Sequence, residues 1–110
     1  MRQSQTAVLE KNTTFSGDFQ TEPFETAWAG EGRWFVQLVD VSGADTSVSV
    51  RAQVSPDGLT WCDYDGVEHA VTGEVLSFPV REFGHWLRLA GSVSGDEPEA
   101  KVRIYLALKS

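Results

Sequence analysis

The stretch Ser55-Pro56-Asp57-Gly58-Leu59-Thr60-Trp61 predicts a tight hairpin near the middle of the 110-residue chain. Pro56 presets φ at the second turn position, Asp57 can hydrogen-bond the backbone of its own turn, and Gly58 accepts the positive φ that completes the reversal. The run before the turn, residues 46–54, alternates small polar with apolar residues without a break. This alternation is the pattern of a half-buried strand, so the turn is expected to join two antiparallel strands.

Other extended runs flank the hairpin, and no stretch has the periodicity of an amphipathic helix. They cover residues 6–10, 13–20, 24–28, 33–41, 67–71, 74–80, 85–90 and 101–109. Turns are expected between them, including 42–45 and the polar segment 91–99. Short strands at roughly 8–12-residue spacing are typical of a sandwich or a barrel. We predict an all-β fold, an antiparallel β-sandwich of about eight strands with jelly-roll or Ig-like topology.

Three runs have expected places in the sheets. Residues 33–41 are nearly continuously apolar, which favours a central strand with both faces partly covered. Pro79 cannot donate a ladder hydrogen bond, so residues 74–80 are expected at an edge. In the last run, alternation places Ile104 and its apolar partners at every second position toward the core.

Length and composition indicate one globular domain, since 41% of the residues are hydrophobic and 23% are charged. Residues 13–110 are expected to form a single β-sandwich domain. Residues 1–12 are expected to form a polar N-terminal arm, with one short edge strand around residues 6–10. In an assembly, such an arm can add a strand to the sheet edge of a neighbouring molecule.

The formal net charge of −7 restricts the expected partners. The nine Lys and Arg residues are scattered along the chain, so neither nucleic acid nor an anionic membrane is an expected partner. The polar start of the chain lacks the apolar core of a signal peptide, which predicts synthesis in the cytoplasm. Cys62 is the single cysteine and cannot form an internal disulfide.

Four tryptophans divide into two pairs. Trp34 and Trp61 are predicted to lie in the core, because each is in phase with apolar neighbours; for Trp61 that neighbour is Leu59. Trp28 and Trp86 lie beside small or polar residues. They are the candidates for an aromatic platform that stacks on a sugar ring.

Acidic residues gather around the hairpin, but they do not match a known calcium loop. The EF-hand spacing of oxygen ligands with a closing Glu is missing. Asp57 is explained as a turn residue. A structural cation held by Asp63 and Asp65 with a backbone carbonyl stays an open alternative, because hard cations accept irregular oxygen shells.

No catalytic or cofactor motif is present in the sequence. Cys62 with His69 or His85 could form a nucleophilic pair, since such partners need only be close in space. A small thiol inside a predicted strand is more often an ordinary packed residue. The chain is therefore predicted not to be an enzyme and to need no cofactor.

The stretch 55–61 resembles the Ser-x-Asp-Gly-x-x-Trp hairpin of small β-sandwich structural proteins of tailed phages and prophages. Residues 85–95, which read His-Trp-Leu-Arg-Leu-Ala-Gly-Ser-Val-Ser-Gly, are followed by Pro98 and the alternating run 102–109. This order is similar to the ending of such proteins, and the resemblance covers roughly residues 33–110. The hairpin is also similar to the Asp-box turn of sialidase-type propellers. That motif has one more residue between Asp and Gly and repeats in a longer chain, so a propeller is excluded.

The resemblance implies a non-enzymatic structural protein of a virion or similar particle, either a head decoration or cement protein or a minor virion protein. Implied partners are a major capsid or other particle protein and further copies of this chain, and the implied final location is the particle. The expected contact residues are Val8 and Leu9 in the arm, and Val75 and Pro79 in the edge strand.

Two alternatives stay open. A carbohydrate-binding β-sandwich module would use Trp28 and Trp86 to stack on sugar rings. A component of a bacterial intracellular protein assembly would self-associate without any virion.

Overall fold

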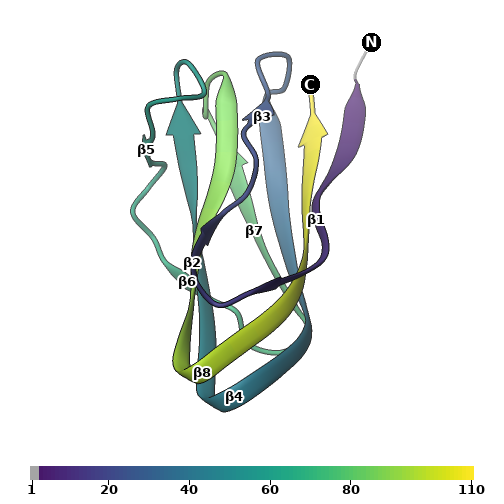
Figure 1. The fold of residues 1–110 in the computed structure, drawn as a ribbon. Helices are drawn as coiled ribbons and strands as arrows, with labels where there is room; N and C mark the ends of the chain where they lie inside the picture. The colour runs from purple at the N-terminus through teal and green to yellow at the C-terminus, as the bar shows by residue number, and fades with distance from the viewer. Residues whose placement is uncertain (1–2) are drawn as a thin grey trace.

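The computed structural model describes residues 3–110, so the first two residues of the expected arm lie outside the described residues. Every regular element among them is a β-strand (Figure 1). The strands are β1 (Ser4–Phe15), β2 (Gly17–Gln20), β3 (Phe24–Glu25), β4 (Glu31–Ser55), β5 (Cys62–Asp63), β6 (His69–Ala70), β7 (Val75–Arg81) and β8 (Trp86–Lys109). The predicted all-β fold is confirmed. Residues 3–110 contain no helix that is long and apolar enough to span a membrane.

Two long strands, β4 and β8, form an antiparallel ribbon that bends in its middle (Figure 1). The first half of β4 pairs with the second half of β8, and the second half of β4 pairs with the first half of β8. The register slips three times between Leu38 and Ser47, which marks the bend. The bend therefore carries the same two strands from one layer of the molecule into the other.

This bent ribbon lies at the centre of two sheets. Sheet I has the order β1, second half of β8, first half of β4, β7. Sheet II has β2 and β3, first half of β8, second half of β4, then β5 and β6. A ribbon folded over so that each sheet receives one half of each long strand gives the jelly-roll order. The β-sandwich prediction is thus confirmed, with jelly-roll rather than Ig-like strand order.

The turns predicted at 42–45 and 91–99 are wrong, because the ribbon stays paired through both segments. Gly43 and Gly95 have φ of 100° and 142°, which lets the chain turn a corner without leaving the ladder. A Cβ atom at Gly43 would lie 2.6 Å from the carbonyl oxygen of Glu97. The facing strand therefore lies too close to Gly43 for a residue with a Cβ atom at that position.

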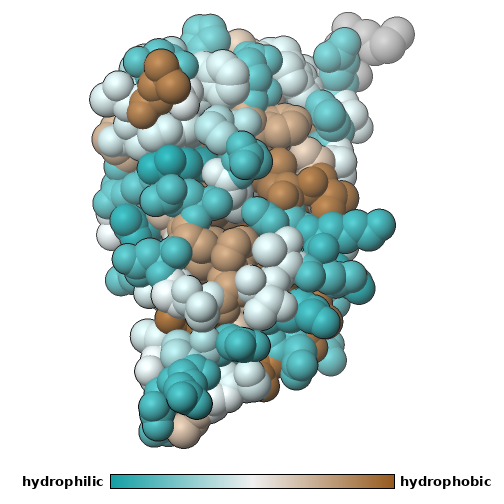
Figure 2. All heavy atoms as spheres, viewed as in Figure 1, coloured by the Kyte–Doolittle hydropathy of each residue, from teal (hydrophilic) through white to brown (hydrophobic). Residues whose placement is uncertain are grey.

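The core lies between the two sheets and follows the predicted alternation. Six large side chains in it are almost fully buried: Trp34, Leu87, Leu89, Ile104, Leu106 and Leu108. Outside it, Figure 2 shows hydrophobic residues as separate small groups among hydrophilic ones on the side in view. The core prediction for Trp34 is confirmed.

The prediction that Leu59 and Trp61 continue the core face is wrong. Leu59 is 84% exposed, and the ring of Trp61 lies over the guanidinium of Arg88, 4.4 Å from it. The turn removes residues 56–61 from the ladder, and pairing resumes only where Cys62 meets Val54. Alternation predicts the facing of a side chain only while the strand stays paired, so it does not extend across this turn.

Candidate interaction surface

The outer face of sheet I presents a row of side chains that is apolar and aromatic on three neighbouring strands and ends on a serine at the fourth. Val8 on β1 pairs with Tyr105 on β8, and Tyr105 pairs with Phe35 on β4. Phe35 in turn pairs with Ser77 on β7. Their neighbours in sequence point into the core, so these side chains face outward. Val8 is 53% exposed, so about half of this apolar residue is accessible to water.

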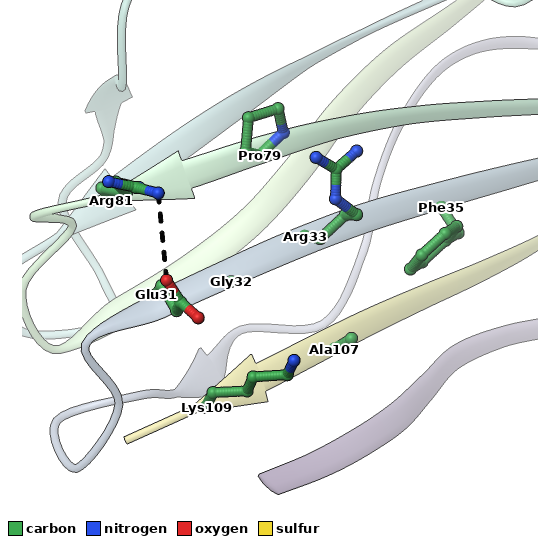
Figure 3. A pocket seen from close by; sticks show the side chains of 8 residues that line it. All are labelled: Glu31, Gly32, Arg33, Phe35, Pro79, Arg81, Ala107 and Lys109. Carbon is green, nitrogen blue, oxygen red and sulfur yellow. Dashed lines mark ion pairs between the residues drawn. The ribbon is translucent and has the colours of Figure 1, made fainter.

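Two further rows lie beside the first. One consists of Thr6, Ala107, Arg33 and Pro79, and the next of Ser4, Lys109, Glu31 and Arg81. Between these rows lies an open hollow of about 370 Å³. Figure 3 shows Arg33, Arg81 and Lys109 reaching it from three different strands. We call this feature the cationic hollow.

Charge in the hollow is only partly balanced. Arg81 lies 4.0 Å from the carboxylate of Glu31, and Arg33 donates a hydrogen bond to the Ser77 hydroxyl at 2.8 Å. Lys109 forms no ion pair with any carboxylate in residues 3–110. The hollow therefore carries excess positive charge in a chain whose net charge is −7.

The fold gathers cations that are scattered in the sequence. Among residues 3–110, five Lys and Arg side chains lie on the outer face of sheet I: Arg33, Arg81, Lys101, Arg103 and Lys109. Three of them come from β8, where alternation already places them opposite the core. The pairing of β8 with β4, and of β4 with β7, brings in the other two.

The predicted contact residues occupy this face in part. Val75 and Pro79 are exposed on β7, which pairs only with β4 among the described strands, so the edge prediction for this strand is confirmed. Val8 is exposed on β1 at the opposite edge of the same sheet. Leu9 instead packs against the core, because alternation turns it inward. Of the hollow residues only Pro79 was predicted; Phe35 and the three cations were not, since their proximity arises from pairing across strands distant in sequence.

The outer face of sheet II carries a network of hydrogen-bonded polar side chains. It lies next to the hairpin turn at residues 55–61, which we call the central turn. Arg88 Nε donates to the Gln53 amide oxygen at 2.7 Å, and the Gln53 amide nitrogen donates to Asp63 at 3.0 Å. Arg51 Nε also donates to Asp63 at 3.0 Å. Hydrogen bonds from Gln53 and Arg51 lower the pKa of Asp63, and burial lowers the pKa of Arg88. The polar and charged groups of this network thus bond to one another, and the Trp61 ring stacks on Arg88.

The two candidate sugar-stacking residues are each half-buried. Trp28 packs against the core. Trp86 packs against the central turn, since a Cβ atom at Gly58 would lie 3.3 Å from its ring. Each ring therefore has one side in contact with the protein.

The central turn is held by one carboxylate. Asp57 Oδ1 accepts hydrogen bonds from the backbone N–H groups of Leu59 and Thr60, both at 2.8 Å. The Ser55 hydroxyl donates to the same oxygen at 3.0 Å. The bonds from Thr60 and Leu59, and then that from Ser55, lower the pKa of Asp57 below its ordinary value of 3.8.

We expect Asp57→Ala to lower the urea midpoint at neutral pH, and this loss to shrink as the pH falls below 3.8. A carboxylate with a depressed pKa in the folded state contributes stability above its unfolded pKa, and that contribution is lost as pH falls through the folded value. The difference in urea midpoint between the wild-type protein and the variant is measured at about pH 7 and at about pH 3. The other carboxylates are the same in both proteins, so their contribution to the pH dependence cancels in this difference. An equal difference at both pH values would contradict the assignment.

The alternative of a cation between Asp63 and Asp65 is not favoured by their contacts. Asp63 is bonded to Arg51 and Gln53, and Asp65 accepts the backbone N–H of Val67 at 3.0 Å. No three His, Cys, Asp or Glu side chains gather as a metal site within residues 3–110. An arginine on Asp63 competes directly with a cation there.

Cys62 and His85 line the same open hollow beside Pro56, together with Glu82. The Cys62 thiol lies 3.8 Å from the carbonyl oxygen of Val54, and no hydrogen bond joins it to His85 among the described residues. His69 lies elsewhere, stacked on Phe78 with ring centroids 3.9 Å apart. The fold brings together one of the two predicted pairs, without the hydrogen bond that would activate the thiol.

No protein-family model matches the sequence, and no curated protein matches it. Solved structures do match the fold. The SPBc2 prophage-derived protein YomS is similar over 100% of this chain and 96% of its own, with a TM-score of 0.61 and 11% identity.

Chains in two virus structures are also similar. One, from the Gt strain of infectious bursal disease virus, matches 98% of this chain and 32% of its own, with a TM-score of 0.58 and 11% identity. The other, from broad bean stain virus, matches 100% of this chain and 88% of its own, with a TM-score of 0.54 and 12% identity. At these identities the likeness establishes a shared β-sandwich fold.

Proposed function

We propose that this chain is a non-enzymatic structural protein of a virion or similar particle, and that it binds the particle through the outer face of sheet I. The observation that carries the proposal is the row Val8, Tyr105 and Phe35, which is apolar, spans three strands and is bordered by cations. The fold shared with a prophage protein along nearly the full length of both chains supports it.

The composition of this face supports a protein contact. Protein interfaces have an apolar and aromatic centre with a polar rim, and Tyr, Phe and Arg are enriched in them. Here Tyr105 and Phe35 form the centre, while Arg33 and Lys109 lie at the rim. Many copies with modest contacts would together bind a lattice strongly, since multivalency adds to the affinity of each contact.

Both edges of sheet I offer a second type of contact. Strands β1 and β7 each pair with one neighbour among the described strands, so each has a free row of backbone groups. A strand from a particle protein could pair with either edge. Pro79 interrupts the donors along β7, which makes β1 the better edge for pairing.

The direct test is density-gradient sedimentation of lysate from the native source, with the chain quantified by mass spectrometry in each fraction. The proposal expects it to peak with large particles in a fixed ratio to their major protein. If the chain stays at the top of the gradient, it is not a particle component. Binding of the purified protein to sugar polymers through Trp28 and Trp86 would then be measured.

We expect Val8→Asp to release the protein from the particle while leaving it folded. The side chain is exposed, so the carboxylate remains in water in the free protein but would be buried in the contact. The matched control is Leu59→Asp, which changes an equally apolar and even more exposed residue outside sheet I. Co-sedimentation of both variants at wild-type level would contradict a contact at β1.

A further inference from the structure

The bent end of the ribbon is strongly acidic. Its two segments, residues 42–46 and 94–99, carry four carboxylates and no Lys or Arg: Asp45, Asp96, Glu97 and Glu99. All four side chains are exposed. Figure 1 places the bend at the lower end of the molecule, and the same end is largely hydrophilic in Figure 2. We call this end the acidic tip.

The cationic hollow lies at the other end of the same ribbon. From Arg33 to Ser42 the strand β4 covers about 30 Å, at about 3.3 Å per residue, in a molecule whose longest dimension is 48 Å. The two features are thus several screening lengths apart at physiological salt. They cannot neutralise each other within one molecule.

We propose that copies of this chain associate head to tail, with the acidic tip of one copy seated in the cationic hollow of the next. The acidic tip, which lies on the same chain, carries the negative charge that the cationic hollow would attract. This favours a second copy as the partner over an unrelated acidic protein. The tip is a narrow two-stranded corner, a shape that fits an open hollow on a sheet face. The apolar residues Phe35, Pro79 and Ala107 in the hollow lining supply the packing surface.

Such a contact has a defined consequence for assembly. It joins two different surfaces, so it leaves one free tip and one free hollow after every addition. Head-to-tail contacts of this kind form rings if the rotation closes and open chains if it does not. This contact gives the outer face of sheet I a second copy of the chain as a partner. It rests on the proposed function only for its biological role.

The first experiment is sedimentation velocity of the purified wild-type protein at rising concentration. Screening lengths fall from about 8 Å at 0.15 M salt to about 3 Å at 1 M, so association is expected at the lower salt concentration and dissociation at the higher. A protein that stays monomeric at low salt at every concentration overturns the inference. Association that persists unchanged at high salt overturns it as well, because the contact would then not be electrostatic.

The second experiment is a charge exchange between the two surfaces. The hollow variant carries Arg33→Glu and Lys109→Glu, which changes the hollow from two positive to two negative charges, and the tip variant carries Asp96→Lys, Glu97→Lys and Glu99→Lys, which changes the tip from four negative to two positive charges; all five positions are exposed. Each variant alone has like charges on both surfaces and is expected to be monomeric. An equimolar mixture is expected to recover the wild-type sedimentation boundary, because each hollow then meets a tip of opposite charge.

Matched controls change the same number of charges elsewhere. Lys11→Glu with Gln20→Glu and Thr72→Glu removes the same total charge as the hollow variant, and Asp18→Lys with Glu22→Lys and Glu68→Lys reverses as many carboxylates as the tip variant; all six positions are exposed, and both controls should associate as wild type does. If the mixture of exchanged variants does not recover association, the tip-to-hollow contact is wrong. The gradient experiment with native particles is independent, so a monomeric protein that still co-sediments would reject this inference and leave the proposed function intact.

Discussion

Replacing Ile104 with aspartate is expected to leave the chain unfolded in water. Ile104 is fully buried in the second half of β8, where it pairs with Val36 of β4 on one side and Glu10 of β1 on the other. An unpaired buried carboxylate costs several kcal/mol, and the lost packing adds roughly 2–5 kcal/mol. Domains of this size have about 5–15 kcal/mol of stability in total. Far-ultraviolet circular dichroism and urea titration measure the outcome.

The control for Ile104→Asp is Lys101→Asp on the same strand. Lys101 lies on the outer face and is exposed, so its replacement should change stability by no more than about 0.5 kcal/mol. The pair therefore tests whether β8 has the alternation described above. A folded Ile104→Asp protein with a wild-type urea midpoint would show that this side of β8 does not face the core.

The second large effect is expected where Phe19 lies over Gly91. The two residues are paired across β2 and β8, and a Cβ atom at Gly91 would lie within 3.0 Å of three ring atoms of Phe19. Phe15 stacks on the same ring, with centroids 4.2 Å apart, so the ring has little freedom to move away. We expect Gly91→Ala to cost about 1–3 kcal/mol through overpacking, and Phe19→Ala to cost about 3–5 kcal/mol through the cavity it leaves.

A double-mutant cycle separates this contact from a general intolerance at Gly91. In the Phe19→Ala background the ring is gone, and Gly91 has no positive φ that would exclude alanine. The Gly91→Ala cost should then fall close to zero, which corresponds to a coupling energy of about 1–3 kcal/mol. Additive effects in urea denaturation of the four proteins would mean that Phe19 does not cover Gly91.

Local sequence patterns were sufficient for most of the fold. Alternation in residues 46–54 and 101–109 predicted strands and their inward faces, because side-chain facing has a period of two wherever a strand is paired. Pro79 predicted an edge strand, because it lacks the donor that an inner ladder requires. The turn at 55–58 was predicted from side chains that act within a few residues of themselves.

The wrong predictions concern segments whose local sequence is compatible with two different structures. Glycines at 43 and 95 with nearby polar residues are typical of turns, but here they let two paired strands change sheets without separating. Trp61 follows the turn in phase with the preceding strand, yet the interrupted pairing places it over Arg88. In both cases the outcome depends on the partner strand, about which the local sequence carries no information.

By itself, the sequence determined that this protein is an acidic all-β domain with strands of known facing and one firmly held turn. Those properties follow from interactions between residues close in the chain, such as turn hydrogen bonds and alternating burial. Only the tertiary structure decided that Arg33, Arg81 and Lys109 form one hollow, and that the acidic tip lies far from it. Strand pairing joins residues dozens of positions apart, so the surfaces through which the protein is proposed to act exist only in the folded chain.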